Sequence, residues 1–269
     1  MKQHLIVLDL DGTLLTKDQR ILPRTKRVLQ QLMNEGHIVM IATGRPYRAS
    51  LPYYEELGLQ TPIVNFNGAL THHPLDASWS ARQHYPIDLP LASEVIAFAE
   101  ERNVHNMIAE VKDDVYLEKE DEQIMHIFGY GEPKIVKGRL RESLAHHPTN
   151  LLLQTDAHSI EQLQKDLTTY FDATISQYNW GSPLYIVELV RTGLHKALGI
   201  RQVARYYNIP RERIIAFGDE ENDLEMIDYA GVGVAMANGI EPLRQIANAT
   251  TKSNEEDGIA WFLEGYFQR

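Results

Sequence analysis

Short apolar runs recur along the chain, and the first of them ends in acidic residues. Residues 5–8 are continuously apolar, which is typical of a strand covered on both faces, as in a parallel sheet flanked by helices. Further strands are predicted at 37–45 and at 62–70, where the run enters a polar turn at 65–68, and helices at 23–35 and 46–57. Strand, helix, strand, helix, strand is the order of a doubly wound parallel sheet.

The pattern changes near residue 83. It predicts a helix at 93–103, a hairpin at 107–119 that turns at Asp113 and Asp114, a strand at 151–155, a helix at 159–171 and a strand at 183–190. Such an order lacks the spacing of βαβ units and indicates an α+β domain. Alternating helices and strands resume after Thr192 and Gly193. We therefore predict a core built from residues 1–82 and 192–269, with a domain inserted at 83–191.

Composition narrows the function classes. The 269 residues suffice for one or two domains, and the net charge of −11 argues against broad binding to nucleic acid or anionic membranes. The chain has no cysteine, which excludes disulfides, thiolate zinc sites and cysteine nucleophiles. No apolar run is long enough to span a membrane, and the early strand leaves no room for a signal peptide, so we expect a cytoplasmic protein.

Polar residues gather where the predicted core elements begin or end, which is where such sheets bind ligands. Asp9 and Asp11 follow the first strand two positions apart, so both would face the same side of an extended chain. Two like charges this close repel unless a cation lies between them, and Mg2+ prefers carboxylate oxygens. Other core segments carry comparable residues: Thr43, Gly44 and Arg45; Lys196; and Asp219, Asn222 and Asp223 in GDEEND.

Each of these segments also has a simpler explanation. Asp and Gly favour turns, Thr43 would cap a helix, and acidic residues suit the first turn of a helix. Lys196 lies near a helix start, where a cation is mildly unfavourable and a bound anion would explain it, although a solvated surface lysine is also common at such a position. Asp219 directly follows a strand and could join Asp9 and the backbone of Asp11 around one Mg2+.

Together the segments resemble the four motifs of the haloacid dehalogenase-like superfamily, and within it those of the Cof-type phosphatases. The four motifs follow one another in the family's order: DLDGT, ATGR, the lysine of HKALGI, and GDEEND. Four further segments also match the family: NGA, YIVEL, GVGVAMAN and SNEEDGIA. MANGIEP departs from the family pattern near Asn238. The resemblance spans nearly the whole chain. It implies an α/β fold: a doubly wound, Rossmann-like parallel-sheet core with an α+β cap inserted between the second and third motifs.

The resemblance also implies a role for each matched residue. Asp9 would attack phosphorus and become an aspartyl phosphate, and Asp11 would protonate the leaving alcohol and then deprotonate water. Mg2+ would be held by Asp9, the carbonyl of Asp11 and Asp219, while Asp223 would orient Lys196 or a metal-bound water. The groups expected to bind phosphoryl oxygens are the Leu10 amide, Thr43, the Gly44 amide, Lys196 and Asn222.

The cap would recognise the leaving group and shield the intermediate from water. Candidate substrate contacts are Tyr185 and Glu188 in the cap and Arg45 and Asn67 in the core, although each could equally be a surface or packing residue. For Trp180, packing is favoured over stacking on a substrate ring.

The resemblance thus implies a Mg2+-dependent phosphatase of small cytosolic phosphomonoesters. Candidates are sugar phosphates, flavin mononucleotide and the phosphorylated pyrimidine intermediate of riboflavin synthesis. A phosphomutase would use the same residues, and a phosphoacceptor regulatory module also places acids, a Thr and a Lys at strand ends. We expect a small phosphorylated metabolite as the partner, with neither nucleic acid nor membrane, and the sequence leaves the oligomeric state open.

Overall fold

The computed structural model describes residues 2–120 and 122–268, which form two compact units. The first unit spans Met1–Arg45, Ser50–Gln83 and His195–Arg269, and the second spans Pro46–Ala49 and His84–Leu194. The domain boundaries expected from the sequence, a cap at 83–191 inserted into a core of 1–82 and 192–269, stay a prediction.

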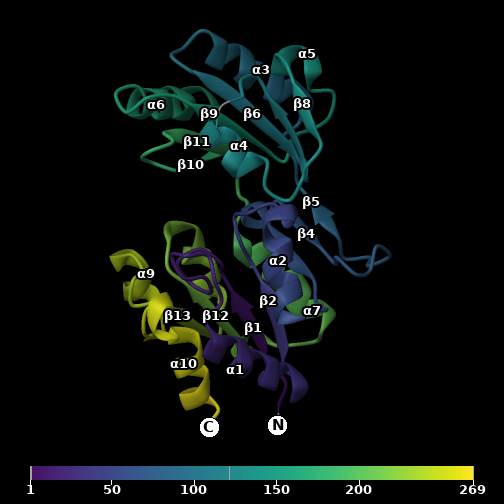
Figure 1. Cartoon of the computed structure of the whole chain (residues 1–269), viewed down its shortest axis with the longest axis vertical. Coiled ribbons are helices and arrows are strands. Elements are labelled where there is room, and N and C mark those ends of the chain that lie inside the picture. Colours follow the sequence, from purple (N-terminus) through teal and green to yellow (C-terminus); the bar gives the residue numbers. More distant parts are fainter. Residues whose placement is uncertain (1, 121, 269) are drawn as a thin grey trace. The chain divides into compact units, whose positions relative to one another are not determined.

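A five-stranded parallel sheet forms the centre of the first unit (Figure 1). Its strand order is β14-β13-β12-β1-β2, and all neighbouring strands run parallel. This sheet confirms the predicted doubly wound core. Its strands are β1 (Leu5–Leu8), β2 (Ile38–Ile41), β12 (Ile214–Gly218), β13 (Val232–Ala235) and β14 (Ala249–Thr250).

Helices cover both faces of this sheet, which is why its strands show no apolar alternation. Leu5 and Val7 pack in one apolar cluster with α7 (Lys196–Tyr206), α8 (Leu224–Tyr229) and α9 (Glu241–Ile246). On the other face, Phe217 of β12 contacts Phe262 of α10 (Gly258–Tyr266), with 5.5 Å between ring centroids. Helix α1 (Pro23–Asn34) packs beside α10 (Figure 1), and α2 spans Tyr47–Leu57.

The strand predicted at 62–70 is interrupted in the structure. Strand β3 (Ile63–Asn65) joins β2 through a single parallel bridge between Ala42 and Val64. The chain then turns through a 3-10 helix at Phe66–Gly68, and β4 (Leu70–His72) pairs antiparallel with β3. Phe66 and Asn67 have positive φ, which no strand tolerates. Strand β5 (Gln83–His84) completes this small sheet.

The second unit is built on a six-stranded sheet in the order β10-β11-β9-β6-β7-β8. Only the β7–β8 pair is parallel. The predicted hairpin is present, with its turn at Lys112 and Asp113 rather than at Asp113 and Asp114. The strands are β6 (Asn106–Val111), β7 (Asp114–Leu117), β8 (Ile135–Lys137), β9 (Asn150–Gln154), β10 (Ile175–Asn179) and β11 (Ile186–Arg191).

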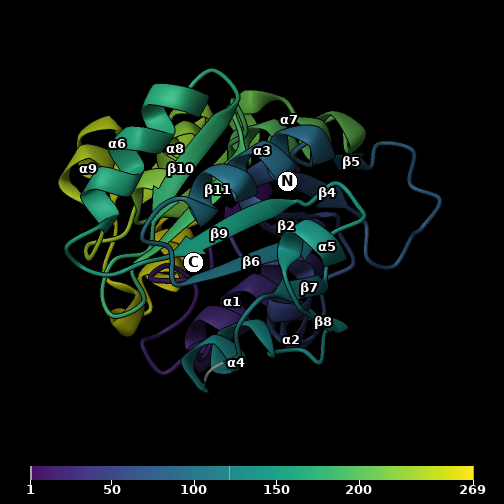
Figure 2. The same ribbon diagram turned by 90° about the horizontal axis from the view of Figure 1, so that it is seen from above.

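Helices also cover the two faces of the second sheet. Helices α3 (Leu89–Glu100), α5 (Leu140–Ser143) and α6 (Ile160–Phe171) pack on one face, which Figure 2 views from above. Helix α4 (Glu122–Phe128) packs on the opposite face, through Ile124 and Phe128 (Figure 1). This unit is the α+β arrangement expected for the inserted part of the chain. Among the described residues, no helix is both long and apolar enough to cross a membrane.

Candidate active site

The carboxyl ends of the parallel strands bring together residues that lie far apart in the sequence. Asp9 directly follows β1, Thr43 lies just beyond β2, and Asp219 directly follows β12. Lys196 is the first residue of α7 and is fully buried. Its ammonium donates to Asp9 Oδ1 at 2.6 Å and to Asp223 Oδ1 at 2.7 Å. These strand and helix ends therefore form one polar site in the first unit.

Lys196 is charged within this site. Burial alone lowers the pKa of a lysine, but the charges of Asp223 and Asp9 outweigh burial and raise the pKa of Lys196 above its ordinary value. Both carboxylate oxygens of Asp223 already have partners, because Oδ1 accepts from Lys196 and Oδ2 accepts from the backbone amides of Asp219 (2.9 Å) and Glu220 (3.2 Å). Asp223 thus holds both Lys196 and the turn after β12.

Asp9, Asp219 and Asp223 offer carboxylate oxygens that lie within 4.8 Å of one another. Burial raises the pKa of Asp9 well above its ordinary value and the pKa of Asp219 to about 7. The neighbouring carboxylates add to this effect, since the charge of one lysine does not balance three buried carboxylates. A divalent cation would balance the remaining charge, and carboxylate oxygens suit Mg2+. Since Lys196 and backbone amides occupy Asp223, the residues that could hold the metal are Asp9 and Asp219, with the nearby backbone of Asp11.

The turn after β1 is shaped around Asp219. Thr13 Oγ1 donates to Asp219 Oδ1 at 2.6 Å. Gly12 has a φ of 74°, and a Cβ at this position would lie 2.1 Å from Asp219 Oδ2, so only glycine fits. Sequence reasoning missed the role of Thr13. The sequence feature that could have pointed to Thr13 is the DLDGT motif, because Thr13 is its last residue.

Asp11 has different surroundings from Asp9, because its side chain is 52% exposed. Arg45 donates to it from Nε (2.7 Å) and from Nη2 (2.5 Å), a two-pronged ion pair. Gln19 accepts from the same Arg45 Nη2 and donates to Asp11 Oδ1 at 3.4 Å. In this structure Arg45, predicted as a substrate contact, therefore orients Asp11. Gln19 was not expected; its partners Asp11 and Arg45 lie 8 and 26 positions away in the sequence.

The groups predicted to bind phosphate lie around the ends of β1, β2 and β12. Thr43 is buried and its Oγ1 accepts from the Arg45 amide at 3.2 Å. Leu10 is fully buried in the turn after β1. Asn222 donates from Nδ2 to Asn67 Oδ1 at 3.0 Å, so these two predicted residues contact each other. The remaining members of the predicted set are Gly44 and Lys196.

Asn238, where the sequence departs from the family pattern, also supports the turn after β1. Its Nδ2 donates to the carbonyl of Gly12 at 2.8 Å, and its Oδ1 accepts from the amide of Asn254 at 3.1 Å. Asn254 in turn donates to the carbonyl of Leu15 at 2.8 Å. The two asparagines brace the turn between Asp11 and Leu15.

Of the candidate contacts in the second unit, Glu188 lies in β11 and Tyr185 directly precedes this strand. Glu188 is buried and accepts from Asn150 (2.9 Å) and from the indole of Trp180 (3.1 Å). Burial, with a smaller contribution from the charge of Glu110, raises the pKa of Glu188 to about 7. Tyr185 packs against the apolar cluster under α3 and α6, and Trp180 stacks on Phe128. The substrate roles of Tyr185 and Glu188 stay predictions.

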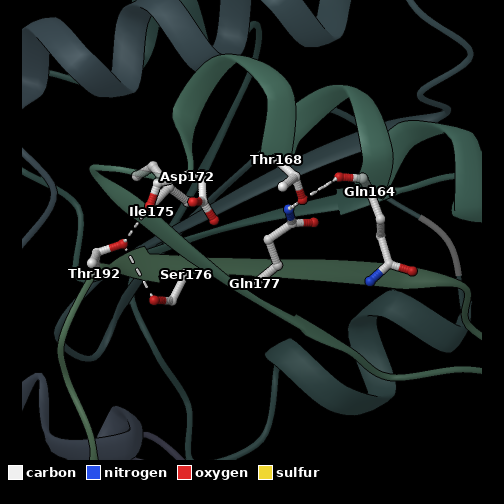
Figure 3. Close-up of a pocket in the computed structure, with 7 residues that line it drawn as sticks. All are labelled: Gln164, Thr168, Asp172, Ile175, Ser176, Gln177 and Thr192. Carbon is white, nitrogen blue, oxygen red and sulfur yellow. Dashed lines mark hydrogen bonds between the residues drawn. The ribbon is translucent and has the colours of Figure 1, made fainter.

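A hollow of about 480 Å3 lies on the second unit, between α6 and β10. Figure 3 shows the side chains that line it. Gln177 crosses it and donates to Thr168 Oγ1 at 2.8 Å and to the carbonyl of Gln164 at 3.1 Å. Gln177 Oε1, in contrast, is buried and has no hydrogen-bond partner among the described residues. No predicted site residue lines this hollow, so it is distinct from the carboxylate site.

Known proteins resemble the chain over its whole length. The profile of a family described as haloacid dehalogenase-like hydrolase matches residues 6–263. The 5-amino-6-(5-phospho-D-ribitylamino)uracil phosphatase YitU of Bacillus subtilis is 46% identical over 266 residues, 99% of this chain and 98% of the relative. The pyridoxal phosphate phosphatase YbhA of Escherichia coli is 26% identical and covers 98% of each chain. A haloacid dehalogenase-like hydrolase structure from Bacteroides thetaiotaomicron has a TM-score of 0.82 at 27% identity, covering 99% of this chain and 100% of the other.

Mg2+ should stabilise the folded protein through Asp219. At a hundred times its dissociation constant, a cation that binds only the folded state raises the free energy of unfolding by about 2.7 kcal/mol. Urea unfolding with and without Mg2+ measures this gain. Asp219→Asn should lose most of it, while Asp228→Asn, which changes an exposed residue, should retain it. Equal stabilisation of both variants would contradict a metal site at Asp219.

Glu188 should make stability fall as the pH rises from about 4.5 to about 7. Over this range the folded protein keeps the proton on Glu188 whereas the unfolded chain releases it, so the free energy of unfolding decreases by up to roughly 3 kcal/mol. Glu188→Gln removes this loss, and urea unfolding at pH 5 and pH 8 measures it. The exposed Glu161→Gln is the control. If the wild type and Glu188→Gln show the same pH dependence, Glu188 is ionised in the folded protein.

Proposed function

The chain belongs to the haloacid dehalogenase-like hydrolases, and we propose that it is a phosphatase that hydrolyses small phosphomonoesters through an aspartyl phosphate on Asp9. The observation that carries the proposal is the position of Asp9. It is buried at the end of β1, with Lys196 on Oδ1 and Asp219 close by. Relatives that match the full length of the chain are named phosphatases.

In the first step, Asp9 Oδ2 would attack phosphorus. Lys196 holds Oδ1, while Oδ2 accepts no hydrogen bond from the described residues. As the new O–P bond forms, the bond from phosphorus to the leaving oxygen breaks, and Asp11 donates its proton to that oxygen. Lys196, Thr43, Asn222 and the amides of Leu10 and Gly44 would bind the phosphoryl oxygens.

In the second step, Asp11 takes a proton from water. The resulting hydroxide attacks phosphorus, the bond from phosphorus to Asp9 breaks, and phosphate is released with Asp9 restored. Arg45 and Gln19 hold the Asp11 carboxylate, ionised once it has given up its proton in the first step, in the orientation in which it takes a proton from water. Bound Mg2+, held by Asp9, Asp219 and the carbonyl of Asp11, would supply neutralisation of charge on the transferred group.

We further propose 5-amino-6-(5-phospho-D-ribitylamino)uracil as the leading substrate. The support is the 46% identity to the Bacillus subtilis phosphatase of that compound, over 99% of this chain. Sugar phosphates and flavin mononucleotide are the competing small phosphomonoesters.

Asp9→Asn should abolish turnover. The amide is a poor nucleophile, so phosphate release should fall at least about a thousandfold. Release is measured with Mg2+ on the wild type and the variant, and urea unfolding shows that both are folded. Asp18→Asn, which changes an exposed aspartate nearby, should retain full activity. Unchanged activity of Asp9→Asn would overturn the proposed mechanism.

A panel of phosphorylated metabolites should rank the aminouracil phosphate first. Discrimination between substrates is measured by the ratio of their kcat/KM values. We expect the kcat/KM of the aminouracil phosphate to exceed those of glucose 6-phosphate, flavin mononucleotide and pyridoxal phosphate by about tenfold or more. Product analysis should show free phosphate, since isomerised sugar phosphates would indicate a mutase instead. A flat profile across the panel would contradict the leading substrate but leave the phosphatase mechanism intact.

A further inference from the structure

The turn at residues 65–68 has an uncommon backbone conformation. Phe66 and Asn67 have φ of 50° and 52°, and both side chains are buried. A bulky residue rarely adopts such a conformation, and it persists only where surrounding contacts impose it. Here the amide of Phe66 donates to the carbonyl of Arg45 at 3.3 Å, and Asn65 Nδ2 donates to the same carbonyl at 2.9 Å.

Asn67 contacts two segments of the phosphate site at once. Its backbone amide donates to the carbonyl of Thr43 at 3.1 Å, and its Oδ1 accepts from Asn222 Nδ2 at 3.0 Å. Its side-chain amide also lies against Gly44, where an added Cβ would be 3.2 Å from Asn67 Oδ1. One residue therefore joins the end of β2 to the turn after β12.

The next residue of the turn reaches a third segment. Gly68 lies against the backbone of His195, so closely that an added Cβ would be 2.4 Å from the His195 carbonyl oxygen. His195 directly precedes Lys196 at the start of α7. The turn thus contacts the segments that carry Thr43, Asn222 and Lys196.

We propose that this turn positions the phosphate-binding groups and that Asn67 is a positioning residue, acting through Asn222 and the loop at Thr43. The proposal rests on the proposed function and deepens it. Asn222 is partly exposed, so without the acceptor on Asn67 its side chain would sample several rotamers. Donors to a phosphoryl group act only when held in place. Asn67 thereby has a role other than direct contact with the leaving group.

The test replaces Asn67 by Gly, which keeps the left-handed backbone and removes the side-chain amide. We expect the inhibition constant of inorganic phosphate, measured with Mg2+, to rise about tenfold, as for loss of one hydrogen bond. KM should rise similarly, while kcat changes less. Asn208→Gly is the matched control, since Asn208 is exposed and has a φ of 54°. Phosphate inhibition of Asn67→Gly at the wild-type level would overturn the proposal.

A double-mutant cycle tests whether Asn67 acts through Asn222. If it does, the loss of phosphate affinity in the double variant Asn67→Gly, Asn222→Ala should be smaller than the sum of the losses in the two single variants. Additive losses would contradict this coupling. Urea unfolding of each variant shows that the comparison is made on folded protein.

The contact between Asn67 and Asn222 can also be tested in the wild-type protein, where folding of a variant is not in question. In 15N-labelled protein with Mg2+, added phosphate should shift the side-chain amide signals of Asn67 and Asn222 over the same concentration range. A response of Asn222 without Asn67 would overturn the positioning role. Absence of any phosphate binding by the wild type would overturn the proposed function as well, so the two failures are distinguishable.

Discussion

The candidate site depends on one buried cation, Lys196. Its ammonium joins the end of β1, through Asp9, to the turn after β12, through Asp223. Moving an ammonium out of water costs several kcal/mol, and the paired carboxylates offset that cost. Removal of the lysine would leave buried carboxylates unpaired, at roughly 3–5 kcal/mol. The contacts that hold the proposed reacting groups in place are therefore also contacts that the fold requires.

The negative charges at this site outnumber the positive ones. Three carboxylates, those of Asp9, Asp219 and Asp223, lie close to one another, and Lys196 pairs with two of them. Burial, together with the charge of Asp223, raises the pKa of Asp219 to about 7. Such a site favours any ligand that brings positive charge, and a dication bound there can in turn accept a phosphoryl group, whose charge has the opposite sign. The acidic net charge of the chain, −11, is thus compatible with an anionic substrate.

The local signals in the sequence predicted much of this arrangement. A continuous apolar run followed by an acidic residue predicted β1 and Asp9. Because ligands bind at the carboxyl ends of parallel strands, Asp9, Thr43 and Asp219 were expected at the same edge of the sheet. The break at Phe66 was not predictable, because contacts with Arg45 impose its backbone conformation and its own propensity does not. The edge strand β10, with the polar sequence ISQYN, gave no clear period and was missed. The bond from Thr13 to Asp219 joins residues 206 positions apart, beyond any local pattern.

Two aspartates separated by a single residue differ because of their surroundings. Asp9 is buried and fixed by Lys196, which suits a nucleophile, since its oxygen must point in one direction without a hydration shell. Asp11 is 52% exposed and held by Arg45 at the surface of the same unit, which suits a group that must exchange protons with alcohol and water. Interchanging the two environments would give a solvated nucleophile and an acid without access to water. The proposed division of roles therefore rests on where the turn after β1 places each carboxylate, and not on the residue type.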